Sequence, residues 1–110
     1  MDKAIRASDI EEQQSWSRET FGPGQRLGGV VKHIRKEVDE AEANPTDVTE
    51  WVDILILAID GAWRQGYAPN EIIQAYHDKM RKNQTREWPD WRGLSENEPI
   101  EHSKGSLDAE

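Results

Sequence analysis

The sequence contains no cysteine, which removes disulfide bonds, thiolate catalysis and metal sites built on cysteine. It shows no secretory signal after Met1 and no apolar run long enough to cross a bilayer, so we expect a cytoplasmic protein without a membrane partner. Basic residues number 14 against 22 acidic ones, and the formal net charge of −8 argues against a general nucleic-acid surface. A phosphorylated substrate is still open, because a metal ion can reverse the field of an acidic pocket.

Strand-like alternation is also missing, so the predicted class is all-α. A length of 110 residues predicts one domain with a modest core, for which an oligomer would be natural. We place the domain at residues 1–92. Residues 93–110 hold five acidic residues against one lysine, and we interpret them as an acidic, flexible tail.

Helical periodicity and helix-ending residues predict how the domain is organised. The predicted helices lie within residues 1–18, 30–44, 47–65 and from 69 towards 89, with a glycine-rich loop at 20–29. Pro45 ends the second helix at Asn44, Thr46 or Asp47 caps the third, and Gly66 ends it. The short connection between the second and third helices makes them antiparallel. The third, with its ILILAI run, is the most apolar and is expected to be buried.

Four acidic residues form two pairs on these antiparallel helices. Glu37 and Glu40 are three residues apart, as are Glu50 and Asp53, so each pair shares one helix face. Both pairs lie near the bend, which predicts four carboxylates in one small volume. Oxygen ligands suit hard cations such as Mg²⁺ or Mn²⁺. The sequence therefore predicts a divalent metal site.

Ordinary structural roles remain open for the same residues. The first pair is also compatible with a solvated helix face, and Glu50 with a capping box that begins at Asp47. Asp60 is placed either in an ion pair with Arg64, four residues on, or in the outer shell of the metal site.

The segment E37-V-D-E40 followed by E50-W-V-D53 resembles the paired acidic motif of the all-α nucleoside triphosphate pyrophosphohydrolases, the MazG-like superfamily. The wider pattern, from TFGPG to REWPDWR, is more similar to the phage dATP/dGTP diphosphohydrolase branch, which includes the MazZ-like enzymes of 2-aminoadenine-containing phage genomes. The resemblance covers about Trp16 to Arg92. The nine residues between Glu40 and Glu50 are fewer than in many superfamily members.

This resemblance implies a helical bundle that assembles as a homodimer or homotetramer. It implies Mg²⁺-dependent cleavage of purine deoxynucleoside triphosphates, above all dGTP, to the monophosphate and pyrophosphate. Two or three Mg²⁺ ions, with Mn²⁺ as a substitute, would be held by Glu37, Glu40, Glu50 and Asp53, and Glu37 or Glu40 would act as general base. A phage-encoded enzyme would work in the host cytoplasm, in nucleotide-pool control or 2-aminoadenine genome synthesis.

Further candidate residues lie on the fourth helix and around the glycine-rich loop. Lys79, Asn83 and Arg86 match the family's phosphate-binding segment, although a basic helix end has the same composition. The loop is either a corner between helices or a base and sugar site, with Trp16, Phe21 and Gly22 as candidate contacts. His33 shares a face with Glu37 and is either a contact to the metal ligands or to the base or sugar of the substrate, or a surface residue.

Three other functions compete with this hypothesis. His77-Asp78 resembles the motif of HD phosphohydrolases, which release tripolyphosphate, but those enzymes need further ligands along a longer domain. A non-catalytic acidic module could bind a basic partner. A di-iron carboxylate bundle is remote, because no glutamate has a histidine three residues later.

Overall fold

The computed structural model describes residues 3–103 of the chain, and these residues form helices and no strand. The helices are α1 (Ala7–Phe21), α2 (Leu27–Ala43), α3 (Val48–Arg64) and α4 (Pro69–Thr85), followed by a single 3-10 turn, η1 (Trp91–Gly93). The predicted all-α class is therefore confirmed. The chain forms two compact units, one ending at Ile73 and one starting at Gln74, so their boundary falls inside α4.

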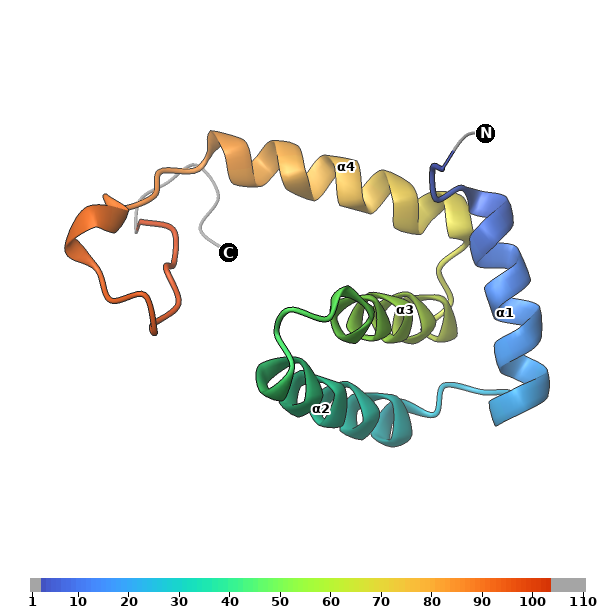
Figure 1. Ribbon diagram of the computed structural model, residues 1–110. Helices are drawn as coiled ribbons and strands as arrows, with labels where there is room; N and C mark the ends of the chain where they lie inside the picture. Colours follow the sequence, from blue (N-terminus) through green and yellow to red (C-terminus); the bar gives the residue numbers. More distant parts are fainter. Residues whose placement is uncertain (1–2, 104–110) are drawn as a thin grey trace. The chain divides into compact units, whose positions relative to one another are not determined.

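Helices α2 and α3 form an antiparallel hairpin in the first unit (Figure 1). Asn44 ends α2 at the predicted position, next to Pro45. The carboxylate of Asp47 then accepts hydrogen bonds from Thr49, at 3.0 Å from the backbone N–H and 2.7 Å from the hydroxyl, so Asp47 is the cap of α3. Gly66 follows α3 with φ 105°, a left-handed conformation that suits glycine.

The hairpin helices approach closely at a glycine of α3. A Cβ on Gly61 would lie 3.4 Å from Cγ1 of Val30, which is 5% exposed. Helix α1 packs on α3, and the side chain of Gln13 donates a hydrogen bond of 2.9 Å to the carbonyl of Ile56. Ile10 and Trp63 are buried with Val30 in the core of the domain. Glycine at position 61 thus leaves room for Val30 where α2 and α3 pack together.

The loop between the first two helices is shorter than predicted. Helix α1 continues to Phe21, and α2 begins at Leu27 rather than at residue 30. The prediction was wrong because Gly28 and Gly29 were assigned to the loop, although they form the first turn of α2. Glycine costs only about 1 kcal/mol in a helix, and packing of a helix face outweighs that cost.

The apolar face of α3 is exposed, contrary to the expected burial of this helix. Trp51 is 54% exposed, Val52 39% and Leu55 45%, whereas Trp63 is 5% exposed as predicted. The indole of Trp51 donates to the carbonyl of Pro45 at 3.0 Å, across the bend. The predicted burial is therefore wrong for these residues, because within residues 3–103 nothing covers all of this face.

The second unit contains most of α4 and the segment that follows. Helix α4 ends at Thr85, before the predicted stop near residue 89. The indole of Trp88 donates to the carbonyl of Asn83 at 2.7 Å, and the backbone N–H of Ser103 donates to the carbonyl of Glu87 at 2.7 Å. Residues 104–110 of the predicted tail lie outside the described residues. None of the helices within 3–103 has the length and apolar content needed to cross a membrane.

Candidate active site

Three of the four predicted metal ligands meet between α2 and α3. Glu37 and Glu40 on α2 and Glu50 on α3 each place one carboxylate oxygen within 4.8 Å of the others. The short connection after Ala43 brings these turns of the two helices to the same height. Asp53 lies one turn further along α3 and is outside this group of three.

Glu37 is the buried member of the cluster, with 8% of its surface exposed. Its Oε1 lies 3.2 Å from Nε2 of His33, one turn earlier on α2. Its Oε2 is buried and accepts no hydrogen bond from any described residue. A buried carboxylate oxygen without a partner costs free energy, so this atom requires a ligand, a cation or a proton.

Glu50 is affected by the same crowding of carboxylates. Its pKa is raised by partial loss of hydration and by repulsion from its neighbours, in decreasing order Glu40, Asp47, Glu37 and Asp53. Asp53 therefore contributes to the field of the cluster although it is outside the group of three. The capping box considered for Glu50 is absent among residues 3–103, where its carboxylate forms no hydrogen bond back to Asp47.

This donor set fits a hard divalent cation. It offers several carboxylate oxygens, one of them buried and unpaired, and a cation would relieve the repulsion on Glu50. The HD dipeptide forms no comparable site within the described residues. The ring of His77 packs against Tyr76 at 5.3 Å, and Asp78 pairs with Arg81 at 3.3 Å on the exposed side of α4.

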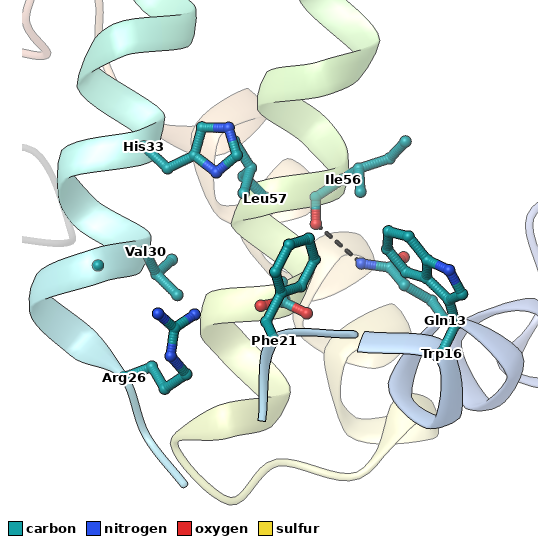
Figure 2. Close-up of a pocket in the computed structure, with 10 residues that line it drawn as sticks. Gln13, Trp16, Phe21, Arg26, Val30, His33, Ile56 and Leu57 are labelled. Atoms are coloured by element: carbon teal, nitrogen blue, oxygen red, sulfur yellow. Dashed lines mark hydrogen bonds between the residues drawn. The ribbon is translucent and has the colours of Figure 1, made fainter. Parts of the chain in front are cut away.

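A pocket adjoins the acidic cluster between α1, α2 and α3 (Figure 2). Three of the predicted base or sugar contacts, Trp16, Phe21 and His33, line it. The rings of Trp16 and Phe21 meet edge to face with their centroids 5.4 Å apart. His33 also contacts Glu37, so the pocket and the cluster are one helical turn apart on α2.

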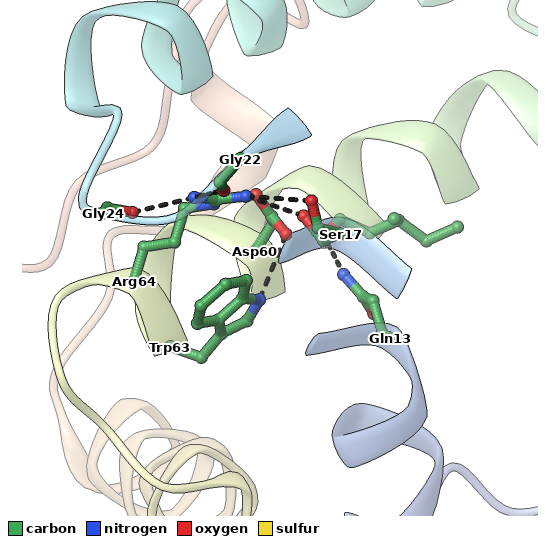
Figure 3. Close-up of polar contacts among 8 residues, drawn as sticks. Gln13, Ser17, Gly22, Gly24, Asp60, Trp63 and Arg64 are labelled. Atoms are coloured by element: carbon green, nitrogen blue, oxygen red, sulfur yellow. Dashed lines mark hydrogen bonds and ion pairs between the residues drawn. The ribbon is translucent and has the colours of Figure 1, made fainter. Parts of the chain in front are cut away.

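Gly22 has a different position from the other predicted contacts. It does not line the pocket, and its carbonyl accepts a hydrogen bond of 3.0 Å from Nη1 of Arg64. Nη1 also donates to the carbonyl of Gly24 at 2.8 Å, and Nη2 donates to the hydroxyl of Ser17 at 2.9 Å (Figure 3). Arg64 thus fixes the end of α1 and the following loop onto α3. Sequence spacing gave no signal for these long-range contacts.

Asp60 completes this buried network. Its Oδ2 accepts from Nε of Arg64 at 2.8 Å, and its Oδ1 accepts from the indole of Trp63 at 3.1 Å (Figure 3). Of the two roles considered for Asp60, the ion pair with Arg64 is present in the structure. Each carboxylate oxygen accepts one hydrogen bond, so Asp60 helps to hold the loop in place, and its role in the outer shell of the metal site stays a prediction.

The predicted phosphate-binding residues belong to the second unit. Lys79 is exposed on α4, and Asn83 accepts a hydrogen bond of 3.1 Å from Nη1 of Arg86. Arg86 follows the end of α4 and is 9% exposed. Their contact with phosphate stays a prediction.

One pocket residue, Arg26, was not found by the sequence analysis. It precedes α2 in a left-handed conformation, with φ 44°, and lines the pocket next to Phe21. The only sequence signal was a basic residue inside the glycine-rich loop, and that loop gave no indication of where its side chain points.

Comparisons with known proteins agree with a nucleotide-cleaving site. The sequence profile of the dATP/dGTP pyrophosphohydrolase family matches residues 9–106. The chain is also similar to the Eaa protein of Salmonella phage P22, with 38% identity over 81 residues. That alignment covers 72% of this chain and 25% of the phage protein, so the chain spans about a quarter of its relative's length. No solved structure gives a significant match.

The matched region includes both acidic pairs, the residues that line the pocket and the basic segment of α4. The chain belongs to the dATP/dGTP pyrophosphohydrolase family.

Proposed function

We propose that this protein hydrolyses purine deoxynucleoside triphosphates, dGTP in preference to dATP, to the monophosphate and pyrophosphate in a Mg²⁺-dependent reaction. The observation that carries this proposal is the buried, unpartnered Oε2 of Glu37 beside Glu40 and Glu50. Membership of the family supports hydrolysis of deoxynucleoside triphosphates in general. The pocket next to the cluster supports a base as part of the ligand.

In this proposal the four acidic residues hold two or three ions, with Mn²⁺ able to replace Mg²⁺. Glu37, Glu40 and Glu50 supply the inner ligands and Asp53 completes the set. When bound, the ions would lower the pKa of water and neutralise charge that develops on phosphate oxygens. Glu37 or Glu40 would accept the proton of the attacking water.

Other residues would bind the base and the distal phosphates of the nucleotide. The base would enter the pocket against Trp16 and Phe21, with His33 at the junction between the pocket and the acidic cluster. Lys79, Asn83 and Arg86 would bind the β- and γ-phosphates, as their match to the family's phosphate-binding segment indicates.

We also propose a cellular setting. Similarity to a Salmonella phage protein supports action in the cytoplasm of an infected cell, on free nucleotides and without a nucleic-acid or membrane partner. The corresponding role is control of the nucleotide pool. For a MazZ-like enzyme it is also a contribution to the synthesis of 2-aminoadenine-containing genomes. In the same proposal, the protein assembles as a homodimer or homotetramer.

The products of dGTP hydrolysis test this function. We expect equal amounts of dGMP and pyrophosphate in the presence of Mg²⁺ and no turnover after addition of EDTA, measured by ion-exchange chromatography. Deoxyguanosine with tripolyphosphate would overturn the proposed mechanism. An absence of turnover with all dNTPs would instead favour a non-catalytic acidic module.

The Glu37→Gln variant tests the site itself. It keeps the shape of the side chain but removes the charge, so we expect activity to fall by about 100-fold or more, equivalent to ~2.7 kcal/mol of transition-state stabilisation. We also expect loss of the Mg²⁺-induced rise in melting temperature, which follows from binding to the native state alone. Asp39→Asn, an exposed acidic position on the same helix, is the control and should keep both. Equal effects of the two variants would place the metal elsewhere.

A further inference from the structure

The pocket beside the acidic cluster has the lining of a small-molecule site. Its cavity volume is about 50 Å³, below the roughly 300–1,000 Å³ of sites that enclose a whole ligand, so a ligand would lie only partly inside it. Most of its wall is apolar or aromatic, contributed by side chains such as Trp16, Phe21 and Val30. A flat, partly apolar ligand therefore fits this wall better than a phosphate group does.

The polar side chains of the pocket wall differ in what they already bind. Gln13 donates to the carbonyl of Ile56, His33 contacts Glu37, and Asp60 is bonded to Arg64 and Trp63. Within residues 3–103, the guanidinium of Arg26 forms no hydrogen bond or ion pair. Arg26 is thus the polar group of this wall that is available to a ligand.

Local geometry directs the Arg26 side chain over the first turn of α2. A Cβ on Gly29 would lie 3.3 Å from Nη2 of Arg26 and 3.6 Å from Cζ, closer than side chains usually pack. Glycine at position 29 therefore leaves the space in which the guanidinium lies. Figure 2 shows this group between α2 and the ring of Phe21, on the pocket side of the helix.

We propose that Arg26 recognises the base of the substrate by donating two hydrogen bonds to O6 and N7 of guanine, and thereby selects dGTP over dATP. This inference rests on the proposed function and adds the residue that determines base specificity. Paired donation from arginine to these two atoms is the commonest specific contact with guanine. Adenine carries an amino group at the position of O6, so two donors would face each other there.

A phosphate contact is the competing role for Arg26, and the length of α2 argues against it. Arg26 and Glu37 are 11 positions apart, or about 16 Å at 1.5 Å per residue. The scissile phosphate must lie at the acidic cluster around Glu37. The base end of the nucleotide, rather than the phosphate end, therefore lies near Arg26.

The experiment compares kcat/KM for dGTP and dATP in the wild type, Arg26→Lys and Arg26→Gln. Lysine keeps the charge but loses the paired donors. We expect both variants to lose about 10- to 100-fold with dGTP, the usual worth of one such contact, and to change less than about threefold with dATP. Equal losses with both nucleotides in Arg26→Lys would assign Arg26 to the phosphates and overturn the inference.

Two neighbouring glycines provide a matched pair of variants. Gly29→Ala should displace the guanidinium and lower the preference for dGTP, whereas a Cβ on Gly28 meets nothing within 4 Å, so Gly28→Ala should keep it. Both changes add the same methyl group to the same turn, and melting curves should show both variants folded. The same loss of preference in both variants, or in neither, would contradict the placement of Arg26.

Binding of dGMP and dAMP by calorimetry separates this inference from the proposed function. The wild type could bind dGMP more tightly than dAMP, and Arg26→Gln could lose this preference, while neither protein hydrolyses a dNTP. That result would support base recognition and reject the enzyme activity. Turnover of dGTP and dATP at equal rates, with equal binding of the two monophosphates, would support the activity and overturn the role of Arg26.

Discussion

Glu37 and Asp60 are both buried carboxylates, but their partners differ. Asp60 has a hydrogen-bond donor for each oxygen, from Trp63 and Arg64, so its charge is compensated inside the chain. Glu37 has one oxygen near His33 and one without a partner within the described residues. At the residue scale, an uncompensated carboxylate indicates a ligand site, whereas a fully bonded one indicates a structural anchor.

The Asp60→Ala substitution should therefore lower the free energy of unfolding of the domain without a specific effect on metal binding. It leaves the guanidinium of Arg64 buried without a carboxylate counter-charge, since the side chains of Asp60 and Arg64 are 9% and 0% exposed. Loss of one partner of a buried ion pair costs about 3–5 kcal/mol, a large share of the roughly 5–15 kcal/mol that stabilises a domain. Urea denaturation followed by circular dichroism measures this change.

The ion pair between Asp78 and Arg81 provides the control, because these side chains are 60% and 70% exposed. Asp78→Ala should cost less than about 1 kcal/mol. If Asp60→Ala kept its stability but lost the Mg²⁺-induced rise in melting temperature, Asp60 would belong to the metal site after all.

Single residues also show where the sequence was informative about the site. Glu37, Glu40 and Glu50 could be grouped because a period of three and a short bend fix their relative heights. Arg26 and the long-range partners of Arg64 could not be found, because their positions depend on the path of a loop. No periodicity describes such a path.

At the scale of elements, helix ends were predictable where one residue sets the backbone. Asp47 and Gly66 bound α3 as expected, because a cap and a left-handed glycine act locally. The start of α2 was missed at Gly28 and Gly29, where tertiary packing overrides a weak local preference.

The cap of α3 should make a measurable contribution to the pH dependence of stability. Hydrogen bonds from the hydroxyl and then the backbone N–H of Thr49 lower the pKa of Asp47 below its ordinary value. A lowered native-state pKa gives stability that is present above the unfolded-state pKa and is lost as the pH falls through the native-state value. The loss should begin near about pH 4, the ordinary range of an aspartate.

Asp47→Asn isolates this contribution, because asparagine caps a helix but does not titrate. We expect the wild type to exceed the variant in melting temperature at pH 6, and the difference to shrink towards pH 3. Thermal unfolding at several pH values gives the comparison, in which carboxylates remote from Asp47 cancel, whereas Glu50, whose pKa Asp47 raises, contributes to the difference. A difference that does not change between pH 6 and pH 3 would show that the charge of Asp47 is not part of the cap.

At the scale of the whole molecule, the exposed face of α3 is the main departure from the sequence-based prediction. Val48, Trp51, Val52 and Leu55 recur at helical spacing and are between 39% and 69% exposed. A continuous apolar stripe of this kind is typical of an interface rather than of a free surface. The sequence marked these side chains by their apolar character and helical spacing, but it contains no information about which surface covers them.

We expect a second copy of this chain to cover the stripe, in line with the proposed homodimer or homotetramer. In a twofold interface each residue is buried twice, and full burial of a large apolar side chain contributes roughly 1.5–3 kcal/mol. Leu55→Glu would place a charge without a partner at the centre of this face, so the variant should sediment as a monomer while its helical circular dichroism is retained. Val38→Glu, at a 48% exposed position on α2, is the control and should sediment like the wild type. Analytical ultracentrifugation at micromolar concentration decides the matter: a monomeric wild type, or a Leu55→Glu variant that still associates, would mean that α3 does not join two copies of the chain.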